Sequence, residues 1–194
     1  MMCTGAFRAA LRDSKANGDA APIGRWLFDH TTGCFDDARP EELNTFPEDI
    51  LRLLCEALRD PDYLQVRSAD LILDVVTWEW GRISMSQRKA LLEALEFAYP
   101  RFHDWMGRFR ITELCGKYFG DESALQMLVR LKNLDDDLQR SLLPHGLEHL
   151  IAWSESPEVA SKAAEQLDEL GRDPSPVVRH EVECSRARLS ARRR

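Results

Sequence analysis

The chain has 194 residues, of which 44% are hydrophobic and 30% charged, and its formal net charge is -7. This balance is typical of a globular protein and excludes an intrinsically disordered one. No apolar stretch approaches the roughly 18 to 20 residues needed to cross a bilayer. Residues 1–16 alternate apolar and charged side chains, unlike a secretory signal. We therefore predict a cytoplasmic protein with no membrane partner.

Five cysteines are spread widely along the chain and none belongs to a CxxC pair. Their number and spacing exclude both a disulfide framework and a zinc knuckle. The simplest interpretation of Cys55 and Cys115, which stand within apolar helical patterns, is a pair of buried thiols.

Charge is distributed unevenly, because five arginines lie in the last nine residues. Residues 1–185 therefore carry a net charge of -12. An acidic body repels phosphate backbones and attracts basic proteins, so we expect no nucleic-acid partner. The arginines themselves predict a frayed, solvated terminus.

Residues 1–43 predict two short helices, at 4–16 and around Ile23 to Phe28, separated by Asn17-Gly18-Asp19 and Pro22. The polar stretch from His30 to Pro40 predicts a loop. We interpret residues 1–43 as a cap over the first unit of the domain that follows, residues 44–194.

Helix starts recur from residue 45 onward at a nearly constant spacing. Thr45-Phe46-Pro47-Glu48 has the form of a capping box, and the starts at Glu48, Ser86, Asp121 and Pro157 are 38, 35 and 36 residues apart. This period predicts helical hairpins at about 45–81, 84–119, 121–154 and 156–192. Their second helices are expected at about 64–80, 101–118, 136–153 and 176–191, with Pro144 dividing or kinking the third.

The stretch from Asp60 to Trp80 predicts a turn and then a two-sided helix. Pro61 fixes its own φ and disfavours helical backbone at Asp60, so the preceding helix ends there. A period of 3.6 residues separates two faces. The core face is expected to hold Val66, Ala69, Ile72, Leu73, Val76 and Trp80, and the outer face Arg67, Asp70, Asp74, Thr77 and Trp78.

Two segments resemble HEAT repeats: DILRLLCEALRDPDYLQVRSADLILDVV and SKAAEQLDELGRDPSPVVRHEVECSRARL. Each joins an apolar helix, an Asp-Pro turn and a Val-Arg helix start. The resemblance implies an all-α fold, a short right-handed superhelical array of about four such hairpins. It also implies a polar ladder of Asp60, Arg67, Asp173 and Arg179, and a concave binding surface lined by the second helices.

The sequence His145-Gly146-Leu147-Glu148-His149 matches the inverted zinc-protease pattern, in which two histidines bind zinc and the glutamate acts as the base. A third ligand is needed, and Glu165 and Glu169 are the nearest candidates. Because Pro144 and Gly146 weaken the helix, we favour two histidines on a polar face, available to a partner. We expect no metal, no cofactor and no catalytic residue.

Two functions from different classes remain. The first is a bacterial immunity protein that occludes a basic toxin domain, and the second is a cytoplasmic adaptor or scaffold. Both are known uses of the family that the chain resembles, and a zinc-dependent hydrolase is a remote third. Interfaces favour Trp, Tyr and Arg anchors. The residues predicted to bind the partner are Asp70, Asp74, Trp78, Arg110, His145, Glu148 and His149.

Overall fold

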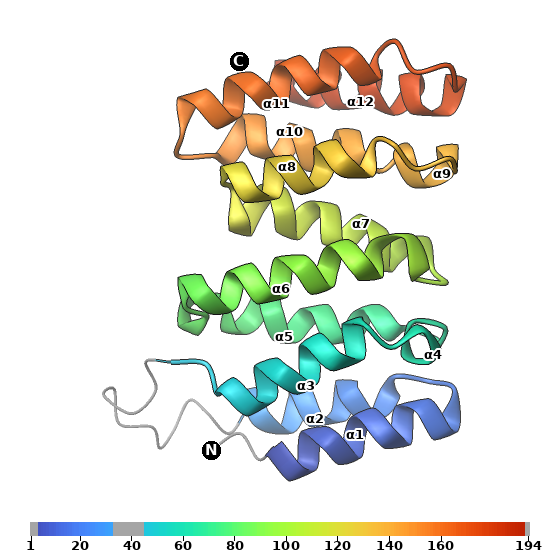
Figure 1. Cartoon of the computed structure of the whole chain (residues 1–194), viewed down its shortest axis with the longest axis vertical. Helices are drawn as coiled ribbons and strands as arrows, with labels where there is room; N and C mark the ends of the chain where they lie inside the picture. The colour runs from blue at the N-terminus through green and yellow to red at the C-terminus, as the bar shows by residue number, and fades with distance from the viewer. Residues whose placement is uncertain (1–3, 33–44, 193–194) are drawn as a thin grey trace. The chain divides into compact units, whose positions relative to one another are not determined.

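The computed structural model describes residues 4–32 and 45–192, without the side chains of 30–32 (Figure 1). These ranges are helical, with one isolated β-bridge between Asp19 and Arg67, which confirms the predicted all-α class. The loop predicted from residue 30 is wrong for residues 30–32, which are helical. Residues 33–40 of that loop, and Arg193 and Arg194 of the predicted frayed terminus, lie outside the described residues. In the described ranges, no helix is both long and apolar enough to span a membrane.

The chain divides into two compact units, unit 1 (Met1–Gly107) and unit 2 (Arg108–Arg194). The boundary falls within a single helix, α7. The helices that lie wholly in unit 1 are α1 (Thr4–Asn17), α2 (Ala21–Thr32), α3 (Glu48–Leu58), α4 (Pro61–Leu64), α5 (Ile72–Glu79) and α6 (Met85–Ala98), with the 3-10 helices η1 (Ala69–Leu71), η2 (Trp80–Arg82) and η3 (Tyr99–Arg101).

Unit 1 is built from two layers of helices, with α1, α3 and α6 in one and α2 and α5 in the other (Figure 1). In the first layer α3 packs against both α1 and α6, and in the second layer α2 packs against α5. Fully buried Ile50, Leu58, Ile72 and Leu73 belong to the core. Burial of such side chains is the main favourable term for folding.

The elements of unit 2 surround one central helix, α10. The elements are α7 (Trp105–Leu114), the π-helical turn η4 (Cys115–Phe119), α8 (Glu122–Leu131), α9 (Asp137–Arg140), α10 (Leu143–Trp153), α11 (Pro157–Leu170) and α12 (Pro176–Arg192). Helix α10 packs against η4, α8, α11 and α12. Figure 1 shows α8 and α11 in one layer and α10 and α12 in the other.

Local capping signals explain where the first helix begins in three of the four predicted hairpins. Ser84 forms a reciprocal capping box with Gln87 at the start of α6, Asp121 caps α8 and Ser156 caps α11. Helix α3 begins at Glu48 as predicted, but Pro47 precedes it without a side-chain cap, so the predicted capping box there is wrong. The entry to α3 is held instead by Gln87, whose side-chain amide donates to the carbonyl of Phe46 at 2.9 Å.

The second helix predicted at 64–80 is broken in the structure. Helix α4 ends at Leu64 and α5 begins only at Ile72. Between them, Ser68 has a φ of 56°, a left-handed conformation that interrupts an α-helix. The backbone N–H of Arg67 donates to the carbonyl of Gly18, and its carbonyl accepts from Ala20, so contact with the α1–α2 turn holds this segment out of the helix.

The two predicted faces of the Asp60–Trp80 stretch are nevertheless confirmed in part, since Thr77 of the outer face is half-buried. Five of the six residues predicted for the core face are buried, and Trp80 is half-buried under the Arg88 guanidinium at 4.2 Å. On the outer face, Arg67 and Trp78 are exposed, while Asp70 and Asp74 are half-buried.

Pro144 divides the third predicted second helix, as expected. Helix α9 ends at Arg140, and α10 begins at Leu143 with Pro144 in its first turn, where the missing N–H removes no helical hydrogen bond. The final second helix is continuous, because α12 runs from Pro176 to Arg192.

Candidate functional site

The outer stripe of η1 and α5 presents an aromatic side chain after two carboxylates. Asp70, Asp74 and Trp78 follow one another at intervals of four residues, which places them on the same side of the helix. The Trp78 side chain is 53% exposed. A tryptophan has the largest apolar surface of any side chain, so this exposure leaves apolar area at the surface of unit 1. Trp105 and Trp153 are exposed to a similar extent, at 55% and 58%. Asp70, Asp74 and Trp78 therefore form a candidate contact surface.

The other four residues predicted to bind a partner lie in unit 2, and two of them are buried. Glu148 is fully buried and His149 is only 8% exposed. The surface position predicted for these two residues is therefore wrong. His145 and Arg110 are half-buried.

The histidines of α10 pack against α7. The His145 ring stacks on Phe109 with centroids 4.2 Å apart, and it meets His149 edge to face at 4.5 Å. Burial lowers the pKa of His145 to about 4, and the charges of Arg188 and Arg192, and of His149 when it is protonated, act in the same direction. Burial also lowers the pKa of His149. Both rings are therefore neutral at pH 7.

Glu148 is bound by two arginines of the C-terminal helix. The Arg188 Nε donates to Glu148 Oε2 at 2.6 Å, and Arg192 Nη2 lies 3.4 Å from Oε1 without hydrogen-bond geometry. Arg186 pairs with Asp168 of α11. The prediction of a frayed terminus is wrong for these three arginines, because they tie α12 to α10 and α11.

The zinc-protease interpretation receives no support from the arrangement of these side chains. Glu165 and Glu169, the candidate third ligands, are exposed on α11, and Glu169 pairs with Lys132, the residue that follows α8. Glu148 faces the arginines of α12. In residues 4–32 and 45–192, no group of three or more potential ligands is positioned to hold a metal ion.

The buried cysteines are poorly suited to nucleophilic chemistry. Cys55 lies in an open groove between α3 and α6 whose rim is charged and whose other apolar residues are Leu51 and Ala90. Burial raises the pKa of the Cys55 thiol to about 11, so it stays protonated at neutral pH. Cys115 is fully buried against the Met127 sulfur.

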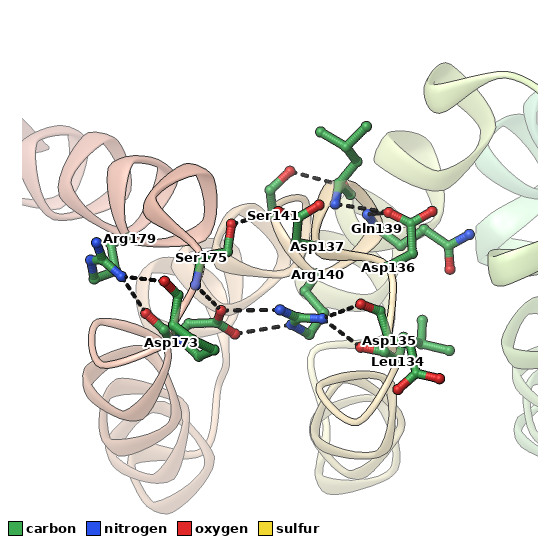
Figure 2. Close-up of polar contacts among 12 residues, drawn as sticks. Leu134, Asp135, Asp136, Asp137, Gln139, Arg140, Ser141, Asp173, Ser175 and Arg179 are labelled. Carbon is green, nitrogen blue, oxygen red and sulfur yellow. Dashed lines mark hydrogen bonds and ion pairs between the residues drawn. The ribbon is translucent and has the colours of Figure 1, made fainter.

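Asp173 and Arg179, predicted for a polar ladder, take part in a network beside α9 and α12 (Figure 2). Arg140 binds both oxygens of Asp173, at 3.0 and 3.1 Å, and the Ser175 hydroxyl donates to Asp137 at 2.8 Å. Arg179 donates to the carbonyls of Asp173 and Pro174. Arg140 and Asp173 are largely buried, at 12% and 9% exposure, so solvent screens their attraction little.

Arg140 and Arg179 occupy equivalent positions in this network. Arg140 donates to the carbonyls five and six residues before it, those of Asp135 and Leu134. Arg179 donates to the carbonyls of Pro174 and Asp173, which are also five and six residues before it. Residues 134–140 and 173–179 therefore share a backbone turn closed by an arginine.

The other two predicted ladder residues, in unit 1, behave differently from each other. Asp60 caps α4 and accepts a 2.6 Å hydrogen bond from Lys15 of α1. Burial by itself would raise the pKa of the Asp60 carboxyl, but the contact with Lys15 lowers it, and the net pKa lies below the ordinary value. The Arg67 side chain is 83% exposed and lies 3.8 Å from Asp19, so it forms no equivalent of the Arg179 contacts.

The sequence interpretation named the Asp-Pro turns at Asp60 and Asp173, but not the recurrence of aspartate turns at three further positions. Before each second helix, an aspartate accepts a hydrogen bond from the backbone N–H two residues later, at 2.7 to 3.0 Å. Asparagine and aspartate favour this turn because their side chains replace a backbone acceptor. A search for aspartate just before each apolar run would have found them. The five aspartates are Asp19, Asp60, Asp104, Asp136 and Asp173.

Comparisons of this chain with protein-family models, with curated proteins and with solved structures found no match.

Proposed function

We propose that the chain is a cytoplasmic, non-catalytic protein-binding module that captures a basic protein. The observation that carries this proposal is the exposed Trp78 on α5, which follows Asp70 and Asp74 on one stripe of the helix. Protein interfaces are enriched in tryptophan at their centres, and acidic surroundings favour encounter with a basic partner. Trp78 is then the anchor, and the two aspartates set the sign of the charge that the partner carries.

The proposed architecture is a right-handed superhelical array of HEAT-like hairpins. Support comes from the five aspartate turns, which follow one another at 41, 44, 32 and 37 residues, and from the shared turn of Arg140 and Arg179. The first turn, at Asp19, lies between α1 and α2. Within this proposal, the N-terminal segment contributes a hairpin of its own as well as a cap.

In its most concrete form the proposal is an immunity protein that inhibits a toxin by covering a basic surface. Support comes from the net charge of -7 and from the acidic side chains of Asp70 and Asp74 that precede Trp78. A toxin that acts on nucleic acid needs a basic surface to bind phosphate, and such a surface is complementary to this chain.

Affinity capture from cells of the source organism tests the proposal. Wild-type chain, Trp78→Ala and the control Trp153→Ala are used as baits in parallel, because Trp153 is 58% exposed but lies in unit 2. We expect a basic protein with wild type and control, and binding weakened by about 2 kcal/mol or more with Trp78→Ala.

The captured protein then decides between inhibition and scaffolding. A toxin should arrest growth when expressed alone, and co-expression of this chain should restore growth. Capture of a multi-subunit housekeeping complex would support an adaptor instead. Equal capture by wild type and Trp78→Ala would show that α5 is not the contact surface.

A further inference from the structure

A histidine and a cysteine lie side by side on the surface of α12. His180 and Cys184 stand four residues apart, an interval that places two side chains on the same face of an α-helix. The His180 Nε2 and the Cys184 Sγ are 3.7 Å apart. His180 is exposed and Cys184 is half-buried, so solvent reaches both residues. An imidazole and a thiol are therefore presented together at the surface of unit 2.

The helix that carries this pair is held in place from its opposite side. At 3.6 residues per turn, the face opposite the pair is the one that is buried, through Val178, Val182 and Ser185. Further along α12, Arg188 binds the buried Glu148 of α10. The backbone between the two donor residues is thus fixed before any ligand binds, and such preorganisation favours a specific site.

The separation of the two donor atoms is that of two ligands on one zinc ion. A thiol is only a weak hydrogen-bond donor or acceptor, so a contact of 3.7 Å between Sγ and Nε2 contributes little by itself. Zinc binds thiolate sulfur at about 2.3 Å and imidazole nitrogen at about 2.0 to 2.1 Å. With a tetrahedral angle between these bonds, the two donor atoms lie about 3.6 Å apart. The observed distance agrees closely with this value.

We propose that His180 and Cys184 bind one Zn²⁺ ion on the exposed face of α12. This site is independent of the proposed function, which uses the α5 surface of unit 1. A thiolate and an imidazole favour zinc over Mg²⁺ and Ca²⁺, which take oxygen ligands. A structural zinc site has four protein ligands, so a site with two leaves the other positions open to water or to a further ligand.

The chemistry of the thiol provides a spectroscopic signature for this site. Zinc binds the thiolate, so the Cys184 proton passes to solvent when the ion binds, and the imidazole binds in its neutral form. Cobalt(II) can take the place of zinc in such sites, and a thiolate ligand gives it a charge-transfer band in the near ultraviolet. This band reports on a cobalt–sulfur bond and is silent for ions held by carboxylates or imidazoles alone.

Titration of the reduced, metal-free full chain with Zn²⁺ and with Co²⁺ tests the proposal. We expect calorimetry to give one Zn²⁺ per chain and Co²⁺ to produce the thiolate band. His180→Gln and Cys184→Ser should each lower the Zn²⁺ affinity at least about tenfold, since even the loss of an outer-shell partner typically costs that much. Cys184→Ser should also abolish the cobalt band. Circular dichroism verifies that both variants keep the helical fold.

Control variants separate this pair from the other thiols and imidazoles of the chain. Cys3→Ser with Cys34→Ser removes two cysteines that lie outside the described residues, and His103→Gln removes an exposed imidazole of unit 1. Both should leave the Zn²⁺ affinity and the cobalt band unchanged. Loss of the band in the Cys3 and Cys34 variant, or wild-type affinity in Cys184→Ser, would overturn the site. If Cys184→Ser removes the band while His180→Gln changes nothing, the thiol binds metal without the imidazole and the proposed pair is wrong.

Discussion

The Glu148 carboxylate is the most consequential buried charge in unit 2. Its own side chain is 1% exposed, whereas Arg188 and Arg192 are 46% and 41% exposed. Glu148→Gln keeps the shape of the side chain but removes the charge that holds both arginines. We expect the free energy of unfolding to fall by about 1 to 3 kcal/mol. This is less than the usual cost of breaking a fully buried ion pair, because the guanidinium groups of both arginines can be solvated by water.

Hydrogen exchange locates the effect of Glu148→Gln. Amides in the last two turns of α12 should exchange faster than in wild type, while those of α8 stay unchanged. Asp168→Asn is the matched control, since Asp168 pairs with Arg186 of the same helix but is 67% exposed. An equal loss of protection in both variants would show that burial of Glu148 is not what secures α12.

The half-buried His145 and the buried His149 of α10 make the stability of unit 2 depend on pH. The folded-state pKa of His145 is about 4 and its ordinary value is 6.5, so the unfolded chain binds the proton first as the pH falls. Stability is therefore complete above pH 6.5 and declines down to about pH 4. The shift sets an upper limit of about 3 kcal/mol for this decline.

Denaturant unfolding at pH 7.5 and pH 5 measures this dependence. Ion pairs lower the pKa of carboxyls such as Asp60 and Asp173, so the contribution of these carboxyls to folding stability is lost mainly below their ordinary pKa near 4. The change in stability between pH 7.5 and pH 5 therefore reports on the histidines. His145→Gln should flatten the difference between the two pH values. Exposed His103→Gln should preserve it.

At the scale of elements, η4 and α10 cross closely because glycines stand at the contact. A Cβ on Gly116 would lie 2.3 Å from the His149 Cβ and 2.5 Å from the Gly146 carbonyl oxygen. Neither neighbour is the end of a flexible side chain, so Gly116→Ala must move one element. We expect a loss of about 1 to 3 kcal/mol in urea unfolding, typical of overpacking.

Gly81→Ala provides the comparison for this crossing, because a Cβ there meets nothing within 4 Å. Its stability should stay close to that of wild type or rise slightly, since alanine lowers the entropy of the unfolded chain. Similar losses for both glycines would point to backbone flexibility rather than to the close approach of η4 and α10.

Helix starts were predictable from sequence because caps are local, and Ser84, Asp121 and Ser156 act on N–H groups within three residues. The break between α4 and α5 was not predictable, because the left-handed Ser68 depends on contact with a turn about fifty residues earlier.

Trp78 was placed correctly at the surface from helical periodicity. The same reasoning failed for Glu148, whose partners lie 40 and 44 residues further along the chain.

At the scale of the whole molecule, charge governs how fast a basic partner is captured. Residues 1–107 carry -6 of the total charge of -7, and the remaining residues carry -1. Attraction between exposed charges is screened over about 10 Å at 0.1 M salt. For the captured partner, we expect the association rate constant to fall about tenfold or more between roughly 50 and 500 mM NaCl, with a smaller change in dissociation.

Three variants separate the roles of charge and aromatic contact in that reaction. The double variant Asp70→Asn with Asp74→Asn should lower the association rate and its salt dependence, because electrostatic steering acts before the two proteins touch. Trp78→Ala should mainly raise the dissociation rate, because side-chain packing acts after contact. Glu155→Gln with Glu165→Gln removes the same charge from exposed positions of unit 2. If this control slows association as much as the α5 pair does, total charge attracts the partner and the α5 stripe has no special part in steering it.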